Sequence, residues 1–451
     1  MICPRSILSQ AVICAALGVS GCASFDPHNL ILRHGVPQGS ESQVPLAAGT
    51  RIAAFEFVWN TIQERYYDAL MNGVDWHAAR VKYQPLALAA EGDDAFWDVL
   101  DKMAGELKDS HTRVESPKEV EERRRHENQS LGLGVAMMEG KLVVTGVNST
   151  SDAWWAGVRP GRAIRSIGGE SAAAAYQRIY DATRNASTAR ARHRQASAKL
   201  NRGEPGSSVS MTFEHADGSL FSATLKRRLI SYPPQLIARL LPSGFAYLRF
   251  SNFQFSLSGK VHAALREYKD APGIIIDLRN NGGGSLEMAK DLFEVFFKDK
   301  AAMSKQITRT EKPIALAWGM VEIIKMEYVT MGKPDAYTGP VAILINAGSA
   351  SGSELFSAAM QDLGRAHIVG EPSCGCLLGY LGYANIPGGG ELAYSELGFV
   401  TPKGRRIEGA GVMPDRLVPL TQADLQVSRD RALEAAQEML KVEAGKNKVA
   451  E

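Results

Sequence analysis

Val341-Ala342-Ile343-Leu344-Ile345 is an uninterrupted apolar run, and it leads into the small polar stretch Gly348-Ser349-Ala350-Ser351-Gly352-Ser353-Glu354. A short apolar run bounded by turn residues is typical of a buried strand. Residues 245–250 and 273–278 have the same strand-like character, and helical stretches lie between and after these segments, for example at 355–363. This alternation of strands and helices predicts an α/β layer around a buried sheet.

We assign residues 231–420 to this α/β core. The rest of the chain differs from it in composition and in the spacing of its apolar residues. Residues 51–128 are predicted to form a helical N-terminal domain, and residues 129–230 a β-rich domain. Residues 421–451 are expected to hold one capped amphipathic helix, from Thr421 to about Val442, and a charged tail. The N-terminal helical spacing depends on Phe55, Val58, Trp59, Ile62 and Tyr66, and again on Phe96, Val99, Leu100, Met103 and Leu107. The expected fold class is therefore multidomain α/β.

Charge is nearly balanced over the chain, with 51 Lys and Arg against 49 Asp and Glu. Because there is no excess of positive charge to attract a phosphate backbone, a nucleic-acid partner is not expected. One long basic stretch, residues 178–202, is rich in alanine. It suits either a helix on a membrane surface or a solvated helix, and its weak apolar face favours the solvated helix.

Residues 1–22 look like a signal peptide. Arg5 precedes the uncharged, apolar segment 11–19, which is too short to span a bilayer. Val19-Ser20-Gly21-Cys22 then resembles a bacterial lipobox. The resemblance implies lipidation of Cys22 and a membrane-anchored protein in the periplasm of a Gram-negative bacterium. The alternative is an ordinary secretory signal with an incidental cysteine.

Processing at Cys22 leaves a mature chain whose first part, residues 23–50, is rich in Gly, Pro, Ser and Gln and is expected to be a flexible tether. Ala23, in place of Asp, points to sorting to the outer rather than the inner membrane. Only Cys374 and Cys376 then remain as thiols, in an oxidising compartment. Their Cys-Gly-Cys spacing makes a small ring in which a disulfide is expected to be strained. Two free thiols and one disulfide both stay open.

Two polar turns in the α/β core have a composition that suits a catalytic site. Asp277-Leu278-Arg279-Asn280-Asn281-Gly282-Gly283-Gly284 follows a predicted strand, and glycines without a Cβ allow backbone N–H groups to approach a ligand closely. Ser351 stands at a strand-to-helix turn, where the helix dipole and N–H groups favour a developing negative charge. Taken alone, the glycines also suit a tight turn and the serine a helix cap.

The stretch that follows the serine is more specific. Met360-Gln361-Asp362-Leu363-Gly364-Arg365-Ala366-His367-Ile368-Val369-Gly370-Glu371-Pro372 resembles the tail-specific (C-terminal processing) serine proteases almost residue for residue, with Ser351 at the position of their nucleophile. The resemblance implies a core of crotonase-like ββα layers. It also matches the glycine triplet to the family's oxyanion loop, so the N–H groups of Gly283 and Gly352 are the expected oxyanion donors.

The β-rich domain is similar to a PDZ domain. Leu131-Gly132-Leu133-Gly134 matches a carboxylate-binding loop, and Ala156-Gly157-Val158-Arg159-Pro160-Gly161 matches the entry to a PDZ strand. Arg162 departs from the pattern, because Asp is usual at that position. The resemblance implies that backbone N–H groups of Leu131, Gly132, Leu133 and Gly134 bind the C-terminus of a substrate peptide.

One departure from the family changes the expected mechanism. The tail-specific proteases activate their serine with a lysine, and Cys376 occupies that position here. A Ser/Lys dyad is therefore excluded. Asp109-Ser110-His111-Thr112 and Arg406-Ile407-Glu408-Gly409 resemble instead the segments that carry the Ser-His pair and the glutamate of the tricorn core. That branch implies a tetrad with His111 as general base, made of Ser110, His111, Ser351 and Glu408.

The sequence thus predicts a serine-type endopeptidase that acts on periplasmic proteins or peptides and needs no cofactor. No metal site is expected, because neither His-Glu-x-x-His nor a Cys/His cluster with ligand spacing occurs. Two alternatives stay open. Loss of the lysine suits a catalytically silent binding protein on the same fold, like the retinoid-binding relatives of the family, although such a protein has no need of Ser351, His111 and Glu408. The other alternative is a redox role for Cys374 and Cys376.

Overall fold

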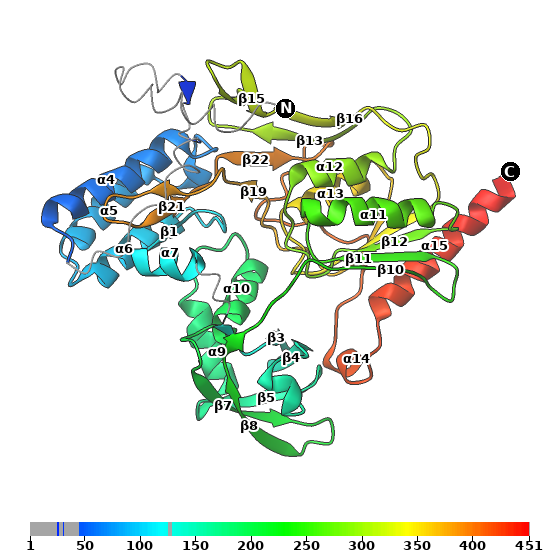
Figure 1. The fold of residues 1–451 in the computed structure, drawn as a ribbon, viewed down its shortest axis with the longest axis horizontal. Coiled ribbons are helices and arrows are strands. Elements are labelled where there is room, and N and C mark those ends of the chain that lie inside the picture. Colours follow the sequence, from blue (N-terminus) through cyan, green and yellow to red (C-terminus); the bar gives the residue numbers. More distant parts are fainter. Residues whose placement is uncertain (1–24, 27–29, 31–44, 125–128, 451) are drawn as a thin grey trace.

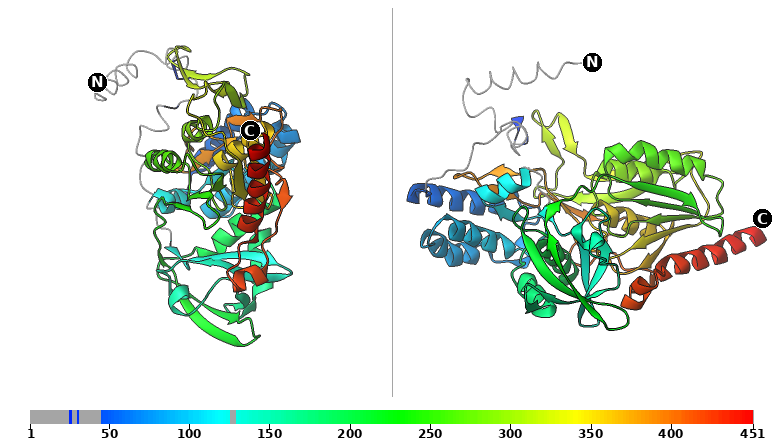
Figure 2. Two further views of the ribbon diagram at one scale, coloured as in Figure 1. Left: turned by 90° about the vertical axis from the view of Figure 1, so that its right-hand side faces the viewer. Right: turned by 60° about the horizontal axis from the view of Figure 1, so that its bottom comes forward.

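The computed structural model describes residues 25–26, 30, 45–124 and 129–450. A helical region lies at one end of the molecule, an α/β region at the other, and a β-rich region below both (Figure 1). When the bottom is turned forward, the β-rich region stands in front of the junction between the other two (Figure 2). The predicted lipidation site Cys22 lies outside the described residues. Within the described part, no helix has both the length and the hydropathy needed to cross a bilayer.

The helical region consists of elements from the N-terminal part of the described chain. Its elements are α4 (Ala48–Arg65), η1 (Met71–Gly73), α5 (Trp76–Leu88), α6 (Asp93–Gly105), β1 (Arg113–Glu115) and α7 (Pro117–Arg124). Asp75 begins α5 by accepting a hydrogen bond from the Ala78 N–H at 2.9 Å. The apolar residues that showed helical spacing in the sequence are buried here, apart from the half-buried Val99.

This helical region does not close its core alone. Leu378, Leu392 and Tyr394, from the α/β part of the chain, are buried in the same cluster as side chains of α4, α5 and α6. β1 also pairs antiparallel with β21 (Glu391–Ala393), which in turn pairs with β20 (Ala384–Asn385). Residues 51–128, predicted as a separate domain, therefore complete their hydrophobic core with side chains from residues 231–420, whose other buried residues form cores of their own.

The β-rich region folds around a sheet of order β3-β4-β5-β7-β8, with β6 paired to β5. Its elements are β2 (Gln129–Ser130), β3 (Leu133–Met138), β4 (Lys141–Val147), α8 (Asp152–Trp155), β5 (Ala163–Ile167), β6 (Glu170–Ser171), α9 (Ala172–Asp181), α10 (Ala189–Asn201), β7 (Ser208–Glu214), β8 (Leu220–Lys226) and β9 (Arg228–Leu229). Side chains from the sheet and the helices, among them Leu142, Tyr176 and Phe213, form a core of their own. β2 and β9 pair antiparallel where the chain enters and leaves the region.

The basic stretch at residues 178–202 is not a single helix. α9 ends at Asp181, and α10 begins only after Thr188, whose Oγ1 accepts a hydrogen bond from the Ala191 N–H at 3.0 Å. α10 buries Ala191, Ala196 and Leu200. Its apolar residues are therefore used within the protein, which agrees with the solvated-helix interpretation rather than with a membrane-surface helix.

The α/β region is organised by a sheet of order β10-β11-β12-β17-β18-β23. Its strands are β10 (Leu236–Leu240), β11 (Ala246–Phe250), β12 (Ile274–Asp277), β17 (Val341–Ile345), β18 (His367–Gly370) and β23 (Arg416–Leu417). β10 is antiparallel to β11, and the remaining neighbours are parallel. The three strands expected from the sequence are the adjacent strands β11, β12 and β17, which confirms the mixed α/β class.

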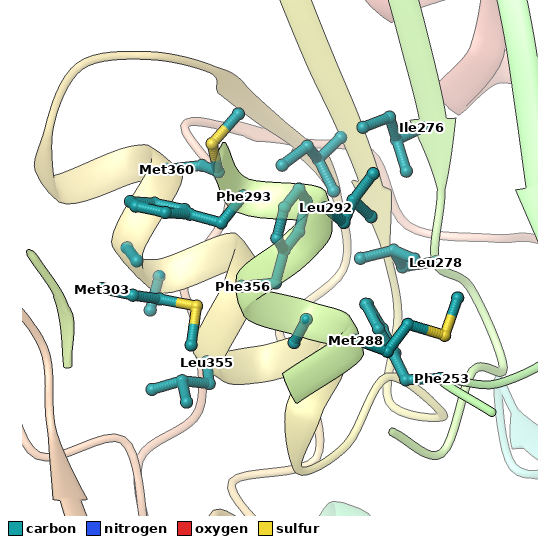
Figure 3. Close-up of a cluster of buried hydrophobic side chains, with 14 of the residues drawn as sticks. Phe253, Ile276, Leu278, Met288, Leu292, Phe293, Met303, Leu355, Phe356 and Met360 are labelled. Carbon is teal, nitrogen blue, oxygen red and sulfur yellow. The ribbon is translucent and has the colours of Figure 1, made fainter. Parts of the chain in front are cut away.

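Alternate residues of these strands face two different cores. Ile276 packs on the side covered by α11 (Phe255–Glu267), α12 (Leu286–Glu294) and α13 (Gly352–Asp362). Its neighbour Ile275 packs on the opposite side, against α15 (Arg431–Ala450). Figure 3 shows the first core, where Phe293 of α12 and Phe356 of α13 lie close together. Both faces of the central strands are thus covered, as expected for a parallel sheet.

A second sheet, of order β16-β13-β22-β19, lies beyond α13. Its strands are β16 (Glu327–Thr330), β13 (Ala301–Ile307), β22 (Leu397–Val400) and β19 (Leu378–Gly379), and β14 (Ile314–Leu316) forms a separate hairpin with β15 (Val321–Ile324). Met303 of β13 is buried in the same core as α13 (Figure 3). Residues 373–377, which precede β19, therefore pass beside the start of α13.

The C-terminal segment contains two helices, and the prediction of one helix from Thr421 to about Val442 was wrong. α14 (Gln422–Gln426) is short, Ser428 has a positive φ of 54°, and α15 starts at Arg431. Asp424 accepts hydrogen bonds from the Arg431 guanidinium at 2.8, 2.9 and 2.7 Å. This ion pair lies across the break and links α14 to the first residue of α15.

Candidate active site

Ser351 occupies the turn between β17 and α13, at the carboxyl end of a central parallel strand, where open α/β sheets bind ligands. Its backbone is strained, with φ 53° and ψ −117°. The Ser351 N–H has two acceptors, Glu354 Oε2 at 3.0 Å and the Cys376 carbonyl at 3.2 Å. A strained strand-to-helix turn of this kind exposes a serine hydroxyl above the sheet, as nucleophilic serines require.

Glu354, the third residue of α13, is fully buried and joins the serine turn to the loop of residues 373–377. Besides the Ser351 N–H, its carboxyl accepts hydrogen bonds from the Gly375 N–H at 2.6 Å, the Cys376 N–H at 2.9 Å and the Ser373 hydroxyl at 2.5 Å. Burial raises the pKa of Glu354, and these hydrogen bonds oppose that shift. The position of the serine thus depends on this one side chain.

The glycine loop lies directly against the serine turn. A Cβ on Gly283 would stand 2.6 Å from the Gly352 backbone nitrogen and 2.8 Å from Ser351 Cβ, and Gly283 has a φ of 89°, so only glycine fits there. The Gly283 N–H, one of the two predicted oxyanion donors, donates to Asn281 Oδ1 at 3.0 Å. The other, the Gly352 N–H, opens α13, where the helix itself provides no acceptor.

Ser110 and His111 lie in a turn that is organised by the buried carboxylate of Asp109. Oδ1 of Asp109 accepts a hydrogen bond from the His111 N–H at 2.7 Å, and Oδ2 accepts from the hydroxyls of Thr112 at 2.5 Å and Ser395 at 2.6 Å. Oδ1 is also 3.8 Å from His111 Nδ1. Asp109, rather than Glu408, is therefore the carboxylate beside the imidazole.

The imidazole of His111 is enclosed by protein. Its side chain is 18% exposed, and the buried Nδ1 makes no hydrogen bond to Ser351 or to any other described residue. Burial lowers the pKa of His111, the charge of Asp109 opposes this effect, and the charges of Arg113 and Arg194 add to it. The ring is therefore neutral near pH 7, the state that a general base requires.

Glu408 is buried on the other side of the same loop, where its Oε2 accepts a hydrogen bond from the Leu377 N–H at 2.6 Å. Burial and, next, the charge of Asp109 raise the pKa of Glu408 to about 8, and a hydrogen bond from the Ser187 side chain partly offsets that rise. Because this carboxyl exchanges its proton near neutral pH, its charge changes in the range where a peptidase works.

The loop of residues 373–377 contacts three members of the predicted tetrad, Ser351, Ser110 and Glu408. The Cys376 carbonyl accepts from the Ser351 N–H, Cys376 Sγ lies 3.8 Å from the Ser110 hydroxyl, and Leu377 donates to Glu408. Cys374 and Cys376 are joined by a disulfide, and both are buried. The structure thus selects the disulfide from the two states that the sequence left open.

The predicted peptide-binding loop, Leu131 to Gly134, is ordered by internal hydrogen bonds. The Leu131 N–H donates to the Asn201 carbonyl at 3.2 Å, the Gly132 N–H to Ser130 Oγ at 3.0 Å, and the Leu133 N–H to Asn201 Oδ1 at 2.9 Å. In this conformation those three groups are not available to a carboxylate. The expected row of unoccupied N–H donors is therefore absent from Leu131, Gly132 and Leu133.

Sequence patterns alone do not assign a role to Asp109, Glu354 or Ser187. Glu354 has a recognisable signal, because serine followed three positions later by glutamate is a capping-box pattern. Ser187 lies between α9 and α10, and nothing in its local sequence distinguishes it from other serines. Among the described residues, no group of three or more His, Cys, Asp or Glu could hold a metal ion.

Two protein-family models match segments of this chain. Residues 244–418, which contain Ser351, the glycine loop and Glu408, match the model of peptidase family S41. The chain contains a peptidase family S41 domain. Residues 51–105 also match the tricorn protease C1 domain, so the resemblance to the tail-specific proteases and the prediction of a serine peptidase are confirmed.

Curated relatives of this S41 peptidase are named as processing proteases. It is 26% identical over 399 residues to the carboxyl-terminal-processing protease of Synechocystis, across 85% of each chain. It is 27% identical over 293 residues to the "Probable CtpA-like serine protease" of Staphylococcus saprophyticus, across 64% of this chain and 53% of that one, so it spans about half of that relative. The solved structure of the photosystem II D1 C-terminal processing protease shares the fold, with a TM-score of 0.56, 22% identity, and coverage of 87% of this chain and 97% of that one.

Proposed function

We propose that this S41 peptidase hydrolyses peptide bonds with Ser351 as nucleophile and His111 as general base, with Asp109 as the carboxylate beside the imidazole and with Ser110 and Glu408 supporting the site through the loop of residues 373–377. The observation that carries the proposal is the strained turn at Ser351, which contacts the same loop, residues 373–377, that contacts Ser110 and Glu408. A silent binding protein gains nothing from a strained serine turn that needs a buried carboxyl to hold it.

The reaction proceeds in two halves. Ser351 Oγ attacks the scissile carbonyl carbon as His111 takes the hydroxyl proton, and the N–H groups of Gly352 and Gly283 stabilise the oxyanion. His111 then protonates the leaving amine as the C–N bond breaks, which leaves an acyl-enzyme ester. A water molecule loses a proton to His111 and attacks that ester, and Ser351 regains its proton when the acid product leaves.

Two local adjustments separate this structure from a reacting site. A ring nitrogen of His111 must come within about 2.6–3.2 Å of the Ser351 hydroxyl, and the Gly283 N–H must leave Asn281 Oδ1. The first costs no hydrogen bond at His111 Nδ1. In the second, the substrate oxyanion replaces the amide oxygen as acceptor, while Asn281 Nδ2 keeps its bond to the Phe250 carbonyl at 2.9 Å.

We also propose that the β-rich region, which is PDZ-like in sequence, receives the C-terminal end of protein or peptide substrates. A cavity of about 300 Å³ opens between β3 and α10, and its lining includes Leu133, Arg194, Arg202 and Tyr232. Neither guanidinium forms an ion pair with a described acidic residue. Guanidinium groups bind carboxylates with charge-assisted hydrogen bonds, so they suit the role that the sequence assigned to the loop N–H groups.

The site of action is proposed from the sequence, on the strength of the lipobox that ends at Cys22. We propose a periplasmic peptidase with a lipid anchor, held at the outer membrane. Expression with Cys22→Ser is expected to release the protein into the soluble periplasm. Full retention of that variant in the membrane fraction would contradict lipidation.

Labelling with a fluorophosphonate tests the serine chemistry, because this reagent reacts with activated serine hydroxyls. We expect the wild-type protein to be labelled and Ser351→Ala to be unlabelled. Cys376→Ser tests the thiol alternative, since it removes the sulfur and the disulfide but leaves a hydroxyl that can still contact Ser110 and keeps every group that takes part in the proposed chemical steps. A folded wild-type protein that is not labelled would support the silent binding protein instead.

A further inference from the structure

Ser187 connects the β-rich region to the catalytic turn. Its backbone N–H donates to Ser110 Oγ at 2.9 Å, its hydroxyl donates to the same oxygen at 2.9 Å, and the Ser110 N–H donates to Ser187 Oγ at 3.0 Å. These three bonds tie the two serines together through both backbone and side chain. Ser187 lies in the segment between α9 and α10, so it belongs to the β-rich region and not to the α/β region that carries Ser351.

The contacts of Ser187 extend to the other carboxyl of the predicted tetrad. The Ser187 hydroxyl has one proton, which it donates either to Ser110 Oγ or to Glu408, and donation to Glu408 favours the charged form of that carboxyl. Ser110 and Glu408 have no direct hydrogen bond to each other among the described residues, so Ser187 bridges them. Ser110 directly precedes His111, whose Nδ1 lacks a partner. A displacement of Ser187 therefore alters the turn that carries the proposed base.

Neighbours of Ser187 seat the start of α10 on the disulfide loop. Thr188 Oγ1 donates to the Cys374 carbonyl at 2.5 Å, and Arg190 Nε donates to the Ser373 carbonyl at 2.6 Å. Ala186 and Ala191 are buried with the two cysteines. These contacts hold Ser187 in a defined place, which a residue with a positioning role needs.

The far end of the same helix forms one wall of the cavity described above. Arg194, Ser197 and Asn201 of α10 line that cavity, while the residues just before its first turn contact Ser110 and the disulfide loop. A ligand in the cavity and the catalytic turn thus contact the two ends of one helix of 13 residues. A shift of this helix on ligand binding moves Ser187 as well.

We propose that Ser187 is a positioning residue of the peptidase, supplied by the β-rich region, which aligns Ser110 and Glu408 and makes the completeness of the site depend on where α10 sits. The inference rests on the proposed function. It adds a residue that sequence motifs do not assign, and a physical route by which occupation of the cavity reaches the catalytic turn.

Ser187→Ala tests this role, with Ser187→Thr as the variant that keeps the hydroxyl and Ser222→Ala, an exposed serine of β8 in the same region, as the control. For a short peptide substrate we expect Ser187→Ala to lower kcat about tenfold with little change in KM, the size of effect that one hydrogen bond to a charged group supports. Ser187→Thr is expected to recover most of the loss. Rates are compared at a temperature where circular dichroism shows every variant fully folded.

The pH profile provides a readout that a merely structural role does not move. Loss of a hydrogen bond that favours charged Glu408 raises the pKa of that carboxyl, so the acid limb that reports Glu408 should shift to higher pH in Ser187→Ala and return in Ser187→Thr. Ser187→Ala with wild-type kcat and an unshifted limb overturns the inference and leaves the proposed function intact. A wild-type protein that neither reacts with fluorophosphonate nor cleaves peptides overturns both.

Discussion

Replacing Glu354 with glutamine tests whether the serine turn is held by one buried carboxyl. Oε1 accepts from Ser373 and Gly375, and Oε2 accepts from Ser351 and Cys376. Glutamine has nearly the same shape but replaces one oxygen with an NH₂ group. With the NH₂ group at the Oε2 position, the N–H groups of Ser351 and Cys376 both face a donor; at the Oε1 position the Ser373 hydroxyl can rotate to accept, so only the bond from the Gly375 N–H is lost.

The magnitude follows from these contacts. A buried hydrogen bond to a charged group is worth about 1.5–3 kcal/mol, and the amide takes the orientation that loses only the Gly375 bond, so the loss costs about 1.5–3 kcal/mol. Part of this is recovered because the variant no longer buries a charge, whose desolvation is the largest influence on the pKa of Glu354. We therefore expect a net loss of about 1–2 kcal/mol in the free energy of unfolding. A serine displaced by about 1 Å should also lower kcat about a hundredfold.

Urea denaturation and the rate of fluorophosphonate labelling measure the two effects separately. Glu371→Gln is the matched control, because Glu371 is also a carboxyl whose pKa is raised by burial, yet its hydrogen bond to the Leu420 N–H is long, at 3.4 Å. We expect this control to be labelled at the wild-type rate. The reasoning is refuted if Glu354→Gln unfolds at the wild-type urea concentration and is labelled as fast as wild type.

Three further predictions concern the base, the second carboxyl and the cavity. His111→Ala and Ser351→Ala should each remove nearly all hydrolysis of casein, whereas Cys376→Ser should keep most of it. If the cysteine variant is inactive and the histidine variant is active, a thiol-based mechanism replaces this one. Activity should rise with pH through the lowered pKa of His111 and again near pH 8, and Glu408→Gln should lose only the second rise. The folded-state pKa of Glu408, about 8, exceeds its ordinary value of 4.5. The contribution of this carboxyl to stability is therefore complete below pH 4.5 and is lost as pH rises to about 8. In urea titrations, Glu408→Gln should become more stable relative to wild type as pH is raised over that interval. Peptides with a free C-terminal carboxylate should bind more tightly than their amides, and a double Arg194→Ala, Arg202→Ala variant should bind both equally; a preference that persists in the variant would return the role to the 131–134 loop.

Features that depend on nearby residues could be predicted from the sequence. Strands β11, β12 and β17 are apolar runs with turn residues at their ends, and the helices of the N-terminal region show regular apolar spacing, because burial of one face imposes a period on the chain. The turn at Ser351 was recognisable because its pattern is also local. A turn that exposes a serine at a helix start needs small residues at fixed positions, and those positions are contiguous.

Sequence patterns were less informative at helix boundaries that involve an ion pair or a cap. The ion pair of Asp424 with Arg431 lies across the break between α14 and α15, and α10 starts where Thr188 caps it. The helical and α/β regions also share a core, since Leu392 and Tyr394 close a cluster begun by residues far earlier in the chain.

The alternation of strands and helices indicated the α/β class, and short contiguous motifs indicated the peptidase family and the residues proposed for the tetrad. How those motifs meet depends on tertiary contacts. Ser110, Ser351 and Glu408 come together because residues 373–377 contact all three, and the cysteine in place of the family's lysine forms a disulfide within that loop. Glu354 and Ser187 owe their roles to partners distant in sequence. A hydrogen bond between distant segments leaves no periodic or local trace, so only the folded chain reveals it.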